Sequence, residues 1–139
     1  MASPQEFGRK VKRFATETCP RAATAKARRA ALGIQRGLIL VSPVDTGRFR
    51  ASWFVATRVA TLDDVPPKPP KGQRSAAGQS AASATQEIAN VRLGDSIHVS
   101  NPLPYGPRLN DGWSKQAPRR FVQMVVRSVL SDRTMRSKR

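Results

Sequence analysis

The chain contains very few of the residues on which metal and disulfide chemistry depend. Its 139 residues include one cysteine, Cys19, and one histidine, His98. One cysteine cannot form an internal disulfide, and the two residues together cannot build a zinc site. We therefore expect a chain without a metal or other cofactor, and metal-dependent catalysis within a single chain is not indicated.

Long apolar runs are also missing. The longest is Leu38–Val41, whereas a helix that crosses a bilayer needs about 20 apolar residues. The chain begins MASPQE, without a basic segment followed by an apolar block, so no secretory signal is expected. These absences predict a protein that is assembled in the cytoplasm and has no membrane partner.

Acidic and aromatic residues are scarce. Nine Asp and Glu residues stand against 25 Lys and Arg, which gives a formal net charge of +16, and aromatic residues make up 6% of the chain. So few carboxylates leave little material for acid–base catalysis, whereas the excess of cations predicts an acidic partner. The length fits one domain, because a single core commonly organises about 100 to 150 residues.

A helix is expected at the N-terminus. Ser3 can cap it, Pro4 suits its first turn, and Glu6 can complete a capping box. Apolar residues then recur at helical spacing in two stripes. The first stripe is Phe7, Val11 and Phe14, and the second is Ala23, Ala27, Ala31, Ile34, Leu38 and Val41.

These two stripes do not share a face. At about 100° per residue they lie roughly half a turn apart, and Pro20, which interrupts helical hydrogen bonding, lies between them. Either two helices meet near Cys19 and Pro20, or one kinked helix buries its two faces against different partners. The second arrangement requires an oligomer, because one small domain rarely covers opposite faces of the same helix.

After the helical region the apolar period changes to that of a strand. The segment Val44–Gly47 predicts a turn. Alternation over Phe49–Val59 predicts a half-buried strand, with Arg48 and Arg50 on its polar face. A short second strand is expected at Ser96–Ser100. Together these patterns favour a small antiparallel sheet.

The remaining segments complete an α+β fold. Residues 63–86 are a Pro-, Ser- and Ala-rich loop whose end, Ser83–Val91, could form a short helix, and residues 103–117 are expected to be irregular. A last helix is expected from Pro118 to Ser131, packed on the sheet, before a basic tail at residues 133–139. We therefore expect one domain over residues 1–132: a long kinked or broken N-terminal helix, a small antiparallel sheet with a long inserted loop, and a C-terminal helix.

Two catalytic interpretations are weak. Asp45-Thr46-Gly47 is the triplet of aspartic proteases, in which two such aspartates share a proton. Those enzymes have a small residue after the glycine and an all-β fold, whereas here Arg48 follows and helical patterns occupy the first 41 residues, so a turn is favoured. Cys19 and His98 could be a nucleophile and its base, but nothing in the sequence orients them. We expect no enzymatic activity.

Two longer blocks are more specific than any of these motifs. Residues 42–53 are SPVDTGRFRASW, and residues 100–118 are SNPLPYGPRLNDGWSKQAP. Both closely resemble blocks of the neck and tail-completion (head–tail joining) proteins of long-tailed bacteriophages. The second block contains the Pro-Tyr-x-x-x-Leu, Gly-Trp-Ser and Gln-Ala-Pro patterns of that family, and the order and separation of the two blocks also fit. The resemblance covers roughly residues 27–130.

This resemblance implies a structural virion protein of the neck, where the tail tube joins the DNA-filled head, and not an enzyme. Such proteins look like α+β subunits that assemble as a ring, and a hexamer would match the usual symmetry of the tail. The implied partners are other copies of the chain, neighbouring neck, tail-terminator or tail-tube proteins, head-side connector proteins, and packaged double-stranded DNA. A tail-side and a head-side position in the neck both remain open.

Candidate functional residues fall into three groups. Asp45, Thr46 and Gly47 would fix the corner between helix and strand. Large or charged groups beside this corner and in the second block are expected to contact another subunit or partner: Arg48, Arg50, Tyr105, Arg108, Trp113 and Gln116. Cations of the loop and tail are expected to face DNA or an acidic partner: Lys68, Lys71, Arg74, Arg133, Arg136, Lys138 and Arg139. Trp53, on the apolar strand face, is expected in the core.

Charge alone supports an alternative function, that of a basic DNA-binding protein without sequence specificity. The cations are spread along the chain, without the interleaved aromatic residues that stack on exposed bases. Contacts with phosphate would suit such a chain, but a channel through which DNA slides should not bind phosphates tightly. In a neck ring, much of the charge is therefore expected to face acidic neighbouring proteins or to hold the last segment of DNA at rest.

Overall fold

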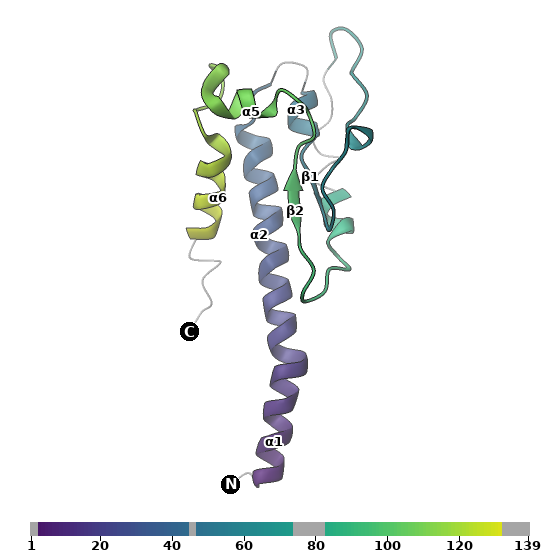
Figure 1. The fold of residues 1–139 in the computed structure, drawn as a ribbon, viewed down its shortest axis with the longest axis vertical. Coiled ribbons are helices and arrows are strands. Elements are labelled where there is room, and N and C mark those ends of the chain that lie inside the picture. Colours follow the sequence, from purple (N-terminus) through teal and green to yellow (C-terminus); the bar gives the residue numbers. More distant parts are fainter. Residues whose placement is uncertain (1–2, 45–46, 74–82, 132–139) are drawn as a thin grey trace.

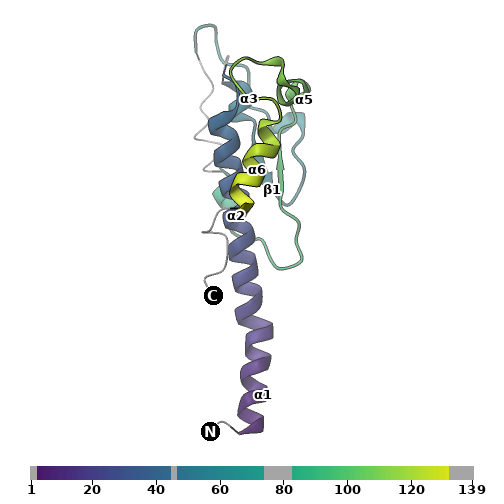
Figure 2. The ribbon, with the colours of Figure 1, turned by 90° about the vertical axis from the view of Figure 1, so that its left-hand side faces the viewer.

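A long helical rod runs through the molecule, and the other elements gather around its C-terminal half (Figure 1). The computed structural model describes residues 3–44, 47–73 and 83–131. The rod consists of α1 (Pro4–Arg13), a π-helical turn (Phe14–Thr18) and α2 (Cys19–Val41). Figure 2 shows that the N-terminal end of the rod projects away from the rest of the chain. We call residues 4–19 the arm and the other described residues the body.

The start of the rod has the predicted cap. The Ser3 hydroxyl oxygen accepts a hydrogen bond from the Glu6 amide at 3.1 Å, and Pro4 is the first helical residue. The rod does not break at Pro20, because the preceding turn is π-helical and the Cys19 amide donates to the Phe14 carbonyl. Of the two predicted arrangements, the structure has the single continuous helix.

The π-helical turn also changes how the two apolar stripes lie. It adds one residue to a turn and so rotates all later residues back by about 100°. The stripes of Phe7–Phe14 and Ala23–Val41 therefore lie roughly a quarter turn apart instead of the half turn that a regular helix would give. They still do not share a face.

The sheet consists of two short antiparallel strands, β1 (Phe54–Ala56) and β2 (His98–Ser100), with Val55 opposite Val99. The antiparallel sheet was predicted, but its first strand was predicted too long. Residues Arg48–Ala51 form α3, a single helical turn that follows Gly47. Arg48 and Arg50 therefore do not project from a strand, as the sequence pattern had indicated.

Contacts with distant residues select this helical turn. The Arg50 guanidinium donates to the carbonyls of Leu40 and Ser42 at 3.2 and 3.1 Å, and the Asn101 side-chain amide donates to the Phe49 carbonyl at 2.9 Å. The apolar pattern permits the turn, because Phe49 and Trp53 are four residues apart and both are buried. Alternation by itself could not distinguish this arrangement from a strand.

The segments between the two strands and after the second strand are more regular than predicted. A 3₁₀ turn covers Leu62–Asp64, and residues 83–87 are helical, as the Ala-rich sequence suggested. The irregular segment expected over residues 103–117 contains α5 (Gly106–Arg108) and a π-helical turn (Leu109–Trp113). That prediction was wrong for residues 106–113.

The last helix, α6 (Phe121–Ser131), ends where predicted but does not begin at Pro118. Arg120 has a φ of 59°, outside the helical range. The Arg120 amide donates to the Asn110 carbonyl at 2.6 Å, and the Val122 amide donates to the Asn110 side-chain oxygen at 3.1 Å. The start of the helix is thus capped by a residue that is distant in sequence.

The main core joins α2, α3 and α6, and the half-buried Val99 of β2 packs against it. Its largest fully buried side chains are those of Phe121 and Leu38. Trp53 is buried as predicted, and its indole N–H donates to the Ser42 hydroxyl at 2.7 Å. A second cluster consists of Ala31, Val55, Ala84, Ile88 and Val91. The structure confirms the mixed helix-and-sheet class, with a long N-terminal helix, a small antiparallel sheet and a packed C-terminal helix.

Candidate functional site

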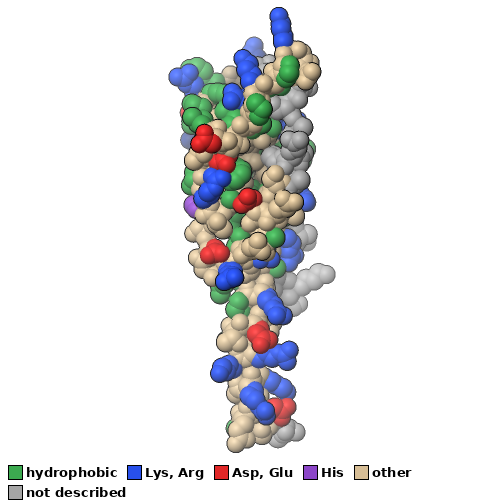
Figure 3. Space-filling model, turned by 90° about the vertical axis from the view of Figure 1, so that its right-hand side faces the viewer, with side chains coloured by type: hydrophobic (Ala, Val, Ile, Leu, Met, Phe, Trp, Pro, Cys, Tyr) green, Lys and Arg blue, Asp and Glu red, His purple; other side chains and the backbone are tan. Residues whose placement is uncertain are grey.

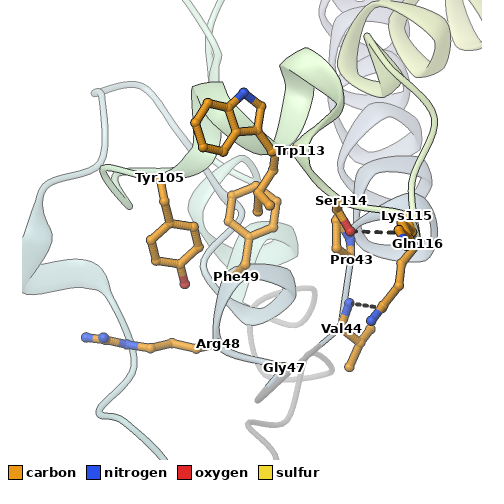
Figure 4. Close-up of a pocket in the computed structure, with 11 residues that line it drawn as sticks. Pro43, Val44, Gly47, Arg48, Phe49, Tyr105, Trp113, Ser114, Lys115 and Gln116 are labelled. Carbon is orange, nitrogen blue, oxygen red and sulfur yellow. Dashed lines mark hydrogen bonds between the residues drawn. The ribbon is translucent and has the colours of Figure 1, made fainter.

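The two sequence blocks, residues 42–53 and 100–118, meet beyond the C-terminal end of α2. The Val44 amide donates to the Gln116 side-chain oxygen at 2.8 Å, and the Asn101 side chain binds the Phe49 carbonyl. A pocket of about 480 Å³ lies between the blocks (Figure 4). Its lining comes from both: Pro43, Val44, Gly47, Arg48, Phe49, Tyr105, Leu109, Trp113, Ser114, Lys115 and Gln116.

Aromatic rings form the walls of this pocket. The rings of Phe49 and Tyr105 are 5.8 Å apart, centre to centre, and Trp113 lines the same pocket (Figure 4). Phe49 is buried, whereas 41% of Tyr105 and 74% of Trp113 are exposed. The Arg108 guanidinium lies 5.3 Å from the centre of the Trp113 ring. Large exposed aromatic groups beside arginine are enriched at the energetic centres of protein interfaces.

The charges on the pocket lining are positive. Arg48 extends along the side of Tyr105 (Figure 4), and its Nε donates to the Pro66 carbonyl at 3.3 Å. Lys115 is exposed on the opposite side. None of the described lining residues is acidic. The described lining therefore suits an apolar group that carries negative charge nearby, and these residues do not include the paired acid and base of a hydrolytic site.

The helix-to-strand corner is described in part. Gly47 has a φ of 77°, in the left-handed region that favours glycine, and it directly precedes α3. Asp45 and Thr46 lie outside the described residues. The predicted role of the triplet therefore has structural support only at Gly47.

Arg50 was predicted at a contact with a partner, and the structure places it against the end of α2. Its two hydrogen bonds occupy the carbonyls of Leu40 and Ser42, at the point where the helix leaves carbonyls without helical donors. Arg50 thereby holds α3 against α2. Its neighbours Arg48, Tyr105, Trp113 and Gln116 line the pocket, and Arg108 contacts Trp113 from outside it.

Of the predicted DNA-facing cations, only Lys68 and Lys71 lie in the described part of the chain. Lys68 and Lys71 are exposed on the segment after the 3₁₀ turn, and neither lines the pocket. The others, Arg74, Arg133, Arg136, Lys138 and Arg139, lie outside the described residues. Their expected contacts with DNA or an acidic partner stay predictions.

Sequence reasoning missed Phe49 and Lys115 as pocket residues. Phe49 was assigned to the inner face of a strand, and Lys115 was not distinguished from the many other cations of the chain. Both lie inside the two blocks that carry the resemblance. That shared membership was the one signal that could have identified them.

The alternative catalytic residues are not assembled into a site. Cys19 is exposed on the rod, and His98 is half-buried in β2. Within residues 3–44, 47–73 and 83–131, no group of three or more His, Cys, Asp or Glu residues could hold a metal ion. Nothing in this part of the chain orients Cys19 toward His98.

The pKa of one carboxyl, that of Asp64, is strongly lowered by a structural ion pair. Two nitrogens of Arg58 donate to Asp64 at 2.7 and 2.6 Å, and the Thr61 amide donates to Asp64 at 2.8 Å. The hydrogen bonds from Arg58, followed by the one from the Thr61 backbone, hold the pKa of Asp64 well below its usual range. Asp64 does not line the pocket, and these bonds close the 3₁₀ turn.

In the described part of the chain, no helix has the length and apolarity that a bilayer crossing requires. No protein-family model matches the chain, and no curated protein or solved structure shows significant similarity to it.

Proposed function

We propose that the chain is a structural subunit of the bacteriophage neck, a tail-completion or head–tail joining component that assembles as a ring between the tail tube and the DNA-filled head. One observation carries this proposal. The two blocks that resemble the neck family, separated by residues 54–99, fold into the walls of one pocket with exposed aromatic and cationic groups. Such a surface is suited to a subunit or partner contact.

The pocket chemistry fits an assembly role better than catalysis. Tyr105 and Trp113 offer large apolar areas to a partner, and Arg48 and Lys115 disfavour a partner segment that places a cation in the pocket. The proposed occupants are another copy of the chain or a neighbouring neck, tail or connector protein. The proposed location is the head–tail junction of the virion.

Removal of the chain from the phage that encodes it tests the proposal. We expect filled heads and finished tails to accumulate separately, and the purified chain to restore joining when it is added to the extract. Tyr105→Ala with Trp113→Ala is expected to fold and to fail in restoration, because both side chains are exposed and belong to the pocket.

The matched control is Leu62→Ala, which removes another exposed apolar side chain, outside the pocket. It should restore joining as well as the original chain does. Normal joining without the chain would contradict the proposal, and so would full restoration by the double variant.

A second candidate function, nonspecific DNA binding, is favoured by the cations of the rod. Arg9, Lys12, Arg21, Lys26 and Arg29 are all exposed, and the whole chain carries a charge of +16. This function predicts that the isolated chain binds duplex DNA with an affinity that falls steeply as salt rises. A gel-shift titration of the purified chain at two salt concentrations separates it from the neck function, which requires no such binding.

A further inference from the structure

The arm carries an apolar stripe that nothing in the described residues covers. Phe7 is 65%, Val11 50% and Phe14 59% exposed. From Ser3 to Cys19 every residue is exposed except the half-buried Glu6, and Figures 1 and 2 show the arm projecting away from the body. The stripe is also rotated by roughly a quarter turn from the face that α2 buries. Because the arm extends beyond the described elements of the body, these elements do not cover the stripe.

The spacing of this stripe is that of a helix–helix seam. Pro4, Phe7, Val11 and Phe14 follow one another at intervals of three, four and three residues. Alternation of three and four is the pattern with which one helix packs along another, each side chain fitting between those of its partner. The stripe is therefore shaped to receive another helix.

The two edges of the seam are electrically neutral. One edge consists of small residues, Gly8 and Ala15, which allow close approach. On the other edge Lys10 lies 3.4 Å from Glu6 in an ion pair within the helix. Arg9 and Lys12 lie on the half of the helix that faces away from the stripe. On the side of the arm visible in Figure 3, the coloured side chains are mainly those of Lys, Arg, Asp and Glu.

We propose that the arm is a self-association element, and that two copies of the chain pair arm to arm along the Pro4–Phe14 seam. An anionic bilayer or an acidic protein would be met best by cations along the edges of the stripe, and the arm has a neutral edge on each side. Nucleic acid would contact the cations and leave the stripe uncovered. A second copy of the same helix presents an equal apolar stripe with equally neutral edges. When the two stripes face each other, Arg9 and Lys12 of each copy point away from the other copy.

The sign of the salt dependence distinguishes this partner from the others. Two chains of charge +16 repel at long range, and salt screens that repulsion. Arm-to-arm pairing should therefore become tighter as salt rises, whereas contact with DNA, anionic lipid or an acidic protein should become weaker.

Sedimentation velocity of the purified full chain at about 0.1 M and about 0.5 M NaCl tests the proposal. We expect a concentration-dependent association that is stronger at the higher salt. Phe7→Ser, Val11→Ser and Phe14→Ser together should raise the dissociation constant about a thousandfold or more, because each large apolar side chain contributes at least about tenfold when buried. The matched control, Arg9→Ser with Lys12→Ser on the opposite side of the same helix, should pair at least as well as the original chain.

A second variant shows whether weaker pairing could result from unfolding of the arm helix. Gly8→Lys leaves the stripe intact and improves helix propensity, but it places a charge on the neutral edge, so pairing should weaken by about tenfold.

An original chain that does not associate by its arm at either salt concentration would overturn the proposal, as would unchanged pairing in the triple variant. Stripe-dependent flotation of an otherwise monomeric chain with phosphatidylcholine–phosphatidylglycerol vesicles would overturn it in favour of a lipid surface. Because this test uses the purified chain alone, its outcome is independent of the neck function.

Discussion

The arm and the body share one helical rod, yet only the body has a core. In the body, Leu38 and Phe121 are no more than 1% exposed, whereas Phe7 and Phe14 of the arm are more than half exposed. Both parts show the same apolar periodicity in sequence. Periodicity therefore predicts a helix in each case, but it does not tell whether the apolar face is covered by the same chain or by another.

Truncation of one phenylalanine in each part should show the largest difference. Phe121→Ala removes a fully buried ring that packs against Phe49 at 6.4 Å, centre to centre, and should lower the free energy of unfolding by about 3–5 kcal/mol. Phe7→Ala should change it by less than about 0.5 kcal/mol, because its ring is exposed. Urea unfolding at concentrations where the chain is monomeric gives both values. Equal losses would mean that the arm is already covered within one chain.

A Gly→Ala substitution should lower stability in the body and raise it in the arm. A Cβ at Gly37 would lie 2.6 Å from Val125 Cγ1, so Gly37→Ala pushes α6 away from α2 and should cost about 1–3 kcal/mol. At Gly8 nothing lies within 4 Å, so Gly8→Ala should stabilise the arm helix by up to about 1 kcal/mol. Urea unfolding measures the first effect, and amide exchange of the arm measures the second.

The control for Gly37→Ala is the addition of Val125→Ala, which removes the clashing methyl groups. The double variant should lose less stability than the two single losses added together. Strict additivity would show that the close approach of α2 and α6 does not depend on this contact.

The ion pairs of the body and the arm should also differ in their contribution to stability, but by a smaller amount. Because the pKa of Asp64 in the folded chain lies below its unfolded value of about 4, the ionised carboxylate stabilises its turn above that pH. The contribution is lost as the pH falls toward the folded-state pKa. NMR titration of the Asp64 carboxyl should show ionisation persisting well below pH 4. In the arm, Glu6→Gln removes an exposed pair and should change stability little. An ordinary titration of Asp64 would contradict the Arg58 contact.

Local sequence signals predicted the parts of the fold that local contacts determine. Ser3 and Pro4 identified the start of the rod, and Gly47 identified a turn that needs a positive φ. The helical turn at Arg48–Ala51 and the start of α6 were missed. Both depend on hydrogen bonds from residues far along the chain, those of Asn101 to Phe49 and of Asn110 to Val122.

Some of the pocket residues were predicted as contact residues, but the pocket itself was not predicted. Arg48, Tyr105, Trp113 and Gln116 were chosen for their size, their charge or their place in the two blocks, and the structure brings them to one surface. Arg50 was chosen for the same reason but binds the end of α2. Side-chain direction at Arg50 depends on the α3 turn, which the alternating pattern could not reveal.

Cryo-electron microscopy of intact phage particles at the head–tail junction tests the proposed function most directly. The account predicts a closed ring of density between the tail tube and the head into which the body fits, with Tyr105 and Trp113 buried against a neighbouring protein. Complete, joined particles that contain no density for this chain at the junction would contradict it.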